Sequence, residues 1–146
     1  MKIAEIAAMK QRQQGITLVE LMIVIVVLGI LVAIGYPNYQ EFSARARRAE
    51  AISALLQIAT NQERFYLNNQ TYTTDMTNLG FESSPWTTET GSYRIRVLPG
   101  ANQNQFVAEA DYQRGGSEAA KCDVFTINSA GVKASTPETD CWVRTR

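Results

Sequence analysis

Residues 11–37 read QRQQGITLVELMIVIVVLGILVAIGYP, and this stretch decides the architecture that the rest of the chain must follow. The run from Ile16 to Tyr36 is almost wholly apolar. At a rise of about 1.5 Å per residue, its roughly 21 residues extend about 30 Å, which is the thickness of a hydrocarbon core. The sequence therefore predicts a membrane-spanning helix over residues 16–37.

Basic residues precede this run, since Lys2, Lys10 and Arg12 are opposed only by Glu5. The positive-inside rule keeps this leader in the cytoplasm and places residues 38–146 on the other side of the membrane. A cleaved secretory signal is disfavoured, because the run is too long and no A-x-A-like cleavage site follows it. Hydropathy alone leaves a plain signal anchor as an alternative.

A single carboxylate, Glu20, lies near the start of the run, where an ionised side chain costs roughly 2.5–3.5 kcal/mol on insertion scales. The string Gly15-Ile16-Thr17-Leu18-Val19-Glu20, with the long apolar tail behind it, resembles the class III leader of type IV prepilins. This resemblance implies that a prepilin peptidase removes residues 1–15, cutting after Gly15, and methylates the new amine at Ile16. Ile16 departs from the family's most common first residue, which is phenylalanine.

Cleavage gives Glu20 a physical role. It creates a cation at Ile16, with an unperturbed α-amino pKa of about 8, four residues before the carboxylate. On a helix the two groups share a face, and a carboxylate in the first turn complements the helix dipole. The resemblance further implies that Glu20 of one subunit meets the Ile16 amine of its neighbour and fixes the axial register. The alternative is a glutamate that extends to the lipid headgroups without such a partner.

The predicted helix contains three weak positions, Gly29, Gly35 and Pro37. A glycine costs a helix about 1 kcal/mol. Pro37 removes the amide that would bond to the carbonyl of Ala33. A kink is predicted near Gly35–Pro37, although the same residues would also allow close packing between helices.

Residues 38–146 are predicted to form a soluble domain that begins with an amphipathic helix over 38–66. Its apolar stripe recurs at three- and four-residue spacing. The stripe consists of Ala51, Leu55, Ile58, Gln62 and Phe65. Arg45, Arg47 and Arg48 are interpreted either as part of a solvated helix face or as contacts to phosphate headgroups.

A loop is predicted at 67–91 and a sheet at 92–134. The loop is rich in Asn, Thr and Ser, and its aromatic residues Tyr72, Phe81 and Trp86 are expected to fix it to the domain. Strands are predicted from alternation at 92–98, 105–113 and 122–128, with a return at 132–134. The predicted fold class is α+β: a long N-terminal helix packed on three or four antiparallel strands, in the ladle arrangement of type IV pilins.

Two cysteines, Cys122 and Cys141, lie near the C-terminus. Export places them in an oxidising compartment, so they are predicted to form a disulfide that bounds a tail over 122–141. The 146 residues contain no histidine. Neither a glycine-rich phosphate loop nor a nucleophile constellation is recognisable, so we predict no enzyme, catalytic residue, cofactor or metal site.

The stretch QERFYLNNQTYTTD at 62–75, continuing to Leu79-Gly80, resembles PilE-type minor pilins. This resemblance implies a minor subunit of a type IV pilus that supports filament initiation, twitching motility, adhesion or DNA uptake. It implies a single-pass inner-membrane protein before assembly and an extracellular one in the pilus. The implied partners are other major and minor pilins, the prepilin peptidase and the inner membrane. A major pilin and a pseudopilin of type II secretion remain alternatives, and the disulfide loop favours a pilin over the major pseudopilin.

A DNA-uptake receptor displayed on the pilus also remains open, because receptors of this kind belong to the same subfamily. Phosphate contacts require clustered cations. The candidate residues are Arg94, Arg96, Arg114, Lys121, Lys133, Arg144 and Arg146. The formal net charge is zero and acidic residues are interleaved with these cations, so the sequence does not decide whether the charges separate in space.

Overall fold

The computed structural model describes residues 15–102 and 104–143. Most of the predicted leader, and Arg144 and Arg146 of the predicted cationic set, lie outside the described residues. The chain divides into two compact units between Asn38 and Tyr39. Each unit is described by itself.

The first unit contains the start of α1 (Leu18–Asn69), a helix of 52 residues. Its first turn is held by Thr17, whose carbonyl accepts the Leu21 N–H at 3.1 Å and whose hydroxyl accepts the Glu20 N–H at 3.2 Å. All side chains from Leu18 to Tyr36 are exposed. This stretch is long and apolar enough to cross a membrane. Pro37 lies inside α1, and a kink at this point stays a prediction.

The second unit begins with the remainder of α1, whose buried positions confirm the predicted apolar stripe. Ala51, Leu55, Ile58 and Gln62 have no exposed surface. The helix ends at Asn69, three residues later than predicted. The side chains of Asn68 and Asn69 donate to the carbonyls of Arg64 and Phe65, at 3.2 and 2.9 Å. These side-chain bonds reinforce the last turns of the helix, where the backbone ladder ends.

The sheet of this unit has five strands, so the prediction of three or four is wrong. The strands are β1 (Trp86–Thr87), β2 (Tyr93–Pro99), β3 (Phe106–Tyr112), β4 (Cys122–Asn128) and β5 (Lys133–Pro137). They follow one another in the order β1-β2-β3-β4-β5, and every neighbouring pair is antiparallel. The additional strand is β1, which lies inside the predicted loop 67–91. Its two residues are too short to show an alternating pattern, and they are defined by pairing with Ile95 and Arg94.

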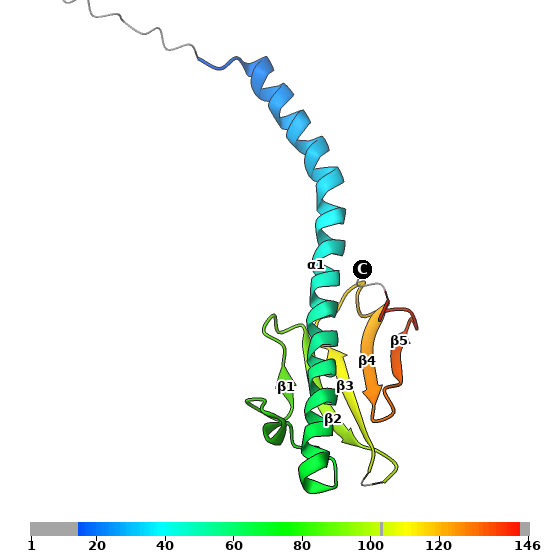
Figure 1. The fold of residues 1–146 in the computed structure, drawn as a ribbon. Coiled ribbons are helices and arrows are strands. Elements are labelled where there is room, and N and C mark those ends of the chain that lie inside the picture. The colour runs from blue at the N-terminus through cyan, green and yellow to red at the C-terminus, as the bar shows by residue number, and fades with distance from the viewer. Residues whose placement is uncertain (1–14, 103, 144–146) are drawn as a thin grey trace, which may run out of the picture. The chain divides into compact units, whose positions relative to one another are not determined.

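One face of the sheet is covered by the second half of α1, as Figure 1 shows. Along β2 the side chains of Tyr93, Ile95 and Val97 are buried and those of Arg94 and Arg96 are exposed, as the alternation predicts. Phe106 and Phe125 add buried rings to this core from β3 and β4. Among the described residues, α1 therefore supplies the long apolar helix face that covers the sheet.

The segment between α1 and β2 is fixed by aromatic contacts, as predicted. The ring of Tyr72 stacks on Tyr66 at 4.8 Å and meets the edge of Phe106 at 4.9 Å. Phe81 contacts Trp86 with 5.4 Å between ring centroids. The segment also contains a short 3-10 helix, η1 (Met76–Leu79). This segment therefore has structure that its polar composition does not reveal.

Candidate functional site

The first candidate site is the start of α1, where the sequence predicts cleavage and methylation. Gly15 and Ile16 lie in non-helical chain ahead of the helix, and Ile16 is exposed. Thr17 caps the helix through the hydroxyl bond to the Glu20 N–H. Thr17 was not among the predicted site residues, although the pattern T-x-x-E of a capping box gives a sequence signal for it. The helix therefore begins only two residues after the predicted new N-terminus.

Glu20 lies in the first turn of α1, on a surface that is otherwise apolar. Its carboxylate lies next to the positive end of the helix dipole, a favourable place for an acidic side chain. Glu20 is the only acidic residue between Leu18 and Tyr36, and its backbone N–H is bound by the capping hydroxyl of Thr17. A role of this carboxylate in setting axial register stays a prediction.

Gly29 and Gly35 lie within the helix, and a Cβ added at either position would meet nothing within 4 Å. Their small size therefore serves no packing within the described part of the chain. Small residues on an apolar helix allow another helix to approach closely. Pro37 follows them inside α1.

The disulfide closes the C-terminal part of the second unit. Cys122 and Cys141 are bonded through their Sγ atoms, with 5.9 Å between Cα atoms and a sequence separation of 19. Both are fully buried in the hydrophobic core. Glu138 and Asp140 lie close to Cys141, but its sulfur is held in the disulfide and does not provide a thiolate for a metal. The bond ties the end of the chain to the start of β4.

Arg48 is buried, which corrects its interpretation as part of a solvated or headgroup-facing cluster with Arg45 and Arg47. Its Nε and Nη2 donate to the two carboxylate oxygens of Glu118, the second at 2.6 Å. The hydrogen bond to Glu118 raises the pKa of Arg48. This pair joins α1 to the connection between β3 and β4.

The predicted cationic residues do not form one patch within the described residues. Arg94 and Arg96 lie on the exposed face of β2, opposite Asp111 and Glu109 of β3. Arg96 Nε donates to Glu109 Oε1 at 3.0 Å. The outer face of these two strands therefore alternates in charge and is not uniformly positive.

Three further predicted cations lie elsewhere among the described residues. Arg114 and Lys121 lie on the connection between β3 and β4, and Lys133 lies on the edge strand β5. The amine of Lys133 lies 5.3 Å from the centre of the Trp142 ring. The Arg114 guanidinium donates to the carbonyl of Thr90.

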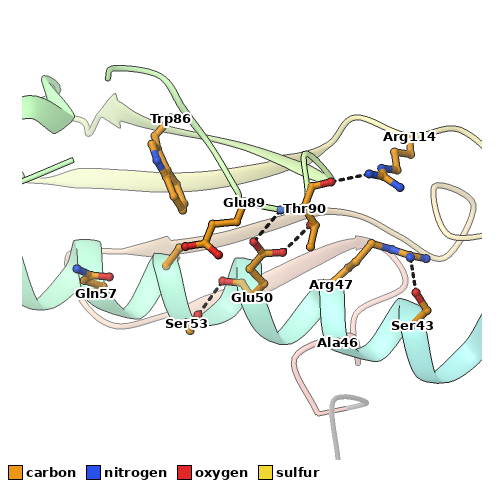
Figure 2. Close-up of a pocket in the computed structure, with 11 residues that line it drawn as sticks. Ser43, Ala46, Arg47, Glu50, Ser53, Gln57, Trp86, Glu89, Thr90 and Arg114 are labelled. Atoms are coloured by element: carbon orange, nitrogen blue, oxygen red, sulfur yellow. Dashed lines mark hydrogen bonds between the residues drawn. The ribbon is translucent and has the colours of Figure 1, made fainter. Parts of the chain in front are cut away.

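A groove of about 650 Å³ runs along α1 in the second unit. Its floor is the helix face of Ser43, Ala46, Glu50, Ser53 and Gln57, at three- and four-residue spacing, with Arg47 and Ala54 beside it. Its wall consists of Trp86, Glu89, Thr90 and Arg114. Figure 2 shows Trp86 at one end of the groove and Arg47 with Arg114 at the other.

A capped apolar helix start, an amphipathic second half and an antiparallel sheet over that half define a pilin-like protein. Family models agree with this class. The model of the prokaryotic N-terminal methylation motif matches residues 10–36. The model described as "Type IV minor pilin ComP, DNA uptake sequence receptor" matches residues 37–126. The chain belongs to the type IV pilin family, in the minor-pilin group that this model describes.

Individual relatives are pilins and a secretion-system subunit. The chain is 30% identical to the type IV major pilin protein PilA of Myxococcus xanthus, over 81% of this chain and 53% of that protein. It is 34% identical to a fimbrial protein of Pseudomonas aeruginosa, over 80% of this chain and 79% of that protein. It is 33% identical to the type II secretion system core protein G of Dickeya chrysanthemi, over 90% and 85%.

The chain spans about half the length of the major pilins of Myxococcus xanthus and Neisseria gonorrhoeae that it resembles, 53% of the first and 46% of the second. The type IV pilin family, to which the chain belongs, is a family of structural proteins. That this chain has no catalytic activity stays a prediction.

Proposed function

We propose that the protein is a minor subunit of a type IV pilus, held in the inner membrane by one helix and then incorporated into an extracellular filament. The observation that carries this proposal is the surface of α1 from Leu18 to Tyr36. It is exposed throughout and apolar except for Glu20 and the small glycines. In water such a surface is unstable, so it requires lipid first and other helices afterwards.

Glu20 and the amine of Ile16 would set the register of assembly. A carboxylate that enters an apolar helix bundle without a partner carries a large desolvation penalty. A neighbouring subunit whose N-terminal amine reaches that carboxylate removes the penalty. Buried polar groups are used in this way to fix register in coiled coils. The proposed partners are therefore other pilins, with the prepilin peptidase acting before assembly at Gly15.

The register role is tested by Glu20→Ala. The variant should insert into the membrane at the wild-type level, because a costly charge is removed from the span, and should be depleted from sheared pili. Glu41→Ala is the matched control, since Glu41 is an exposed carboxylate on the same helix beyond the apolar surface. Wild-type recovery of Glu20→Ala in sheared pili would contradict the register role.

A second function, binding of DNA for uptake, is favoured by the family model over residues 37–126, whose description names a DNA uptake sequence receptor. Arg94, Arg114 and Lys121 are exposed cations of the second unit that are available for phosphate contacts. Because Arg94 faces Asp111 across the strands, any such surface must recruit cations from more than one element.

DNA binding is tested with the full chain in a neutral detergent, titrated with duplex DNA across a salt series. The affinity should fall as salt rises, with a slope set by the number of phosphates contacted. An affinity that is absent or independent of salt would remove this second function and leave the pilus subunit unaffected. Recovery in sheared surface fibres also separates the pilin proposal from the type II secretion alternative, for which the protein would remain in the cell envelope.

A further inference from the structure

Another hollow of the second unit, of about 340 Å³, lies between the segment that follows α1 and the turn between β2 and β3. Figure 1 shows that the end of α1 and this turn lie at the same end of the unit. The rings of Tyr72 and Phe106 join the two sides of the hollow, with 4.9 Å between their centroids. Its walls are residues 71–74 on one side and, on the other, Pro99, Gly100, Asn102, Gln105 and Phe106.

Both walls are held in place by hydrogen bonds to the backbone. The side chain of Gln62, which has no exposed surface, donates to the Thr73 carbonyl at 2.6 Å and accepts the Thr73 N–H at 3.2 Å. On the opposite wall, the Gly100 N–H donates to the Gln105 carbonyl at 3.0 Å. The buried glutamine in the apolar stripe of α1 therefore fixes the segment that lines the hollow. The shape of the hollow is set before a ligand arrives, as in most small-molecule sites.

The lining offers apolar surface and hydrogen-bonding groups but no charge. No acidic or basic side chain lines the hollow within the described part of the chain. The ring of Tyr72 is half-buried, Pro99 is exposed, and the Tyr72 hydroxyl already donates to Glu63 at 3.0 Å. The exposed side chains of Thr74 and Gln105 form no hydrogen bond with other described residues. One hydroxyl and one amide are therefore available to a ligand beside an apolar surface.

This combination selects the chemistry of the ligand. An anion or a cation would find no opposite charge on the lining. A wholly apolar molecule would take water away from Thr74 and Gln105 without replacing their hydrogen bonds. An uncharged molecule with many hydroxyls and with apolar C–H faces suits both kinds of surface, because hydroxyl and amide side chains each donate and accept. Sugar rings have this composition.

We propose that the hollow binds an uncharged saccharide. The Tyr72 ring and Pro99 contact the C–H groups of the sugar, since the face of an aromatic ring is negative and attracts such hydrogens. Thr74 and Gln105 form hydrogen bonds with the hydroxyls of the sugar. This inference goes beyond the proposed function and does not depend on it, because all of these residues belong to the second unit.

The test uses the full chain, isotopically labelled, in a neutral detergent whose headgroup is not a sugar. Uncharged oligosaccharides that end in glucose, galactose or N-acetylglucosamine are titrated separately, and the backbone amide signal of Gly100 is followed by NMR. At least one oligosaccharide should shift this signal to saturation. Gln105→Ala and Thr74→Val should each weaken its binding about fivefold, the loss expected for one hydrogen bond. Gln105→Ala retains the backbone groups that hold the turn.

The matched control is Gln57→Ala, because Gln57 is an exposed glutamine that does not line this hollow. It should leave the affinity for the saccharide unchanged. An equal loss of affinity in the control overturns the inference, and so does the absence of a saturable shift with every uncharged oligosaccharide.

Three competing ligands complete the test. A sialylated or sulfated form of the same oligosaccharide should bind no more tightly than the uncharged form, and tighter binding would contradict selection by a neutral lining. An uncharged peptide rich in serine and glycine, and duplex DNA, should not displace the saccharide at lower concentration. Displacement by either would overturn the inference and assign the hollow to a peptide or to nucleic acid.

Discussion

Arg48 and Glu118 are both buried, with side chains that are 6% and 8% exposed. Each provides the other's counter-charge through two hydrogen bonds, so removal of one leaves the other without a counter-charge in the interior. Glu118→Gln should lower the free energy of unfolding by about 3–5 kcal/mol. Chemical denaturation of the full chain in detergent, followed by circular dichroism, measures this loss.

The matched control for that variant is Glu109→Gln, which breaks the more exposed pair with Arg96. Exposed ion pairs contribute about 1 kcal/mol or less. Similar losses for the two variants would show that burial of the Arg48–Glu118 pair has no energetic consequence.

Tyr93 should make stability depend on alkaline pH. Its hydroxyl is fully buried, donates to the carbonyl of Cys122 at 3.2 Å, and burial raises its pKa. An unfolded tyrosine ionises near pH 10, so above about pH 10 the folded chain holds a proton that the unfolded chain loses. The free energy of unfolding should then fall as pH rises from about 10 toward the raised pKa. Stability measured from pH 9 to 11 should decline less steeply in Tyr93→Phe, and equal slopes would contradict this assignment.

Among the elements, the β2–β3 hairpin depends on Gly100. A Cβ at this position would lie 2.3 Å from Gln105 Cβ and 2.6 Å from the Gln105 backbone carbon. Because the obstacle includes backbone, Gly100→Ala should force the hairpin apart and destabilise the unit by about 1–3 kcal/mol. Thermal unfolding measures the effect. Gly115→Ala is the control, since a Cβ there meets nothing within 4 Å, and it should leave the melting temperature nearly unchanged.

The elements also show what the sequence could and could not predict. The buried stripe of α1 and the alternation of β2 were predicted correctly, because each follows from the period of its own element. Strand β1 was missed, since two residues have no period and are held only by pairing with β2. The extension of α1 to Asn69 was missed for a similar reason, because side-chain bonds from Asn68 and Asn69 support its last turn.

The site residues show the same division between local patterns, which the sequence reveals, and contacts between distant residues, which it does not. Gly15, Ile16 and Glu20 were selected by a local string, and the family model of the methylation motif covers that string. The burial of Arg48 could not be predicted, because its partner Glu118 is 70 residues away. The cationic set on the sheet also depends on register: only the pairing of Arg96 with Glu109 shows that its charge is compensated.

For the whole molecule, two units carry separate parts of the proposed function. The first supplies an apolar surface marked by one carboxylate. The second supplies a closed core under α1, secured by the disulfide between Cys122 and Cys141. A subunit of this kind is stable only in lipid or among copies of the same helix. The exposed surface of its second unit can carry different functions on the same fold.

The most direct measurement for this account is the mass of the N-terminal peptide from protein extracted from the native membrane. Removal of residues 1–15 and one added methyl group on Ile16 is the expected result, because the amine created there is the partner required by Glu20. A peptide that retains the leader, with Gly15 still joined to Ile16, would contradict the account and leave a protein tethered by an uncleaved anchor.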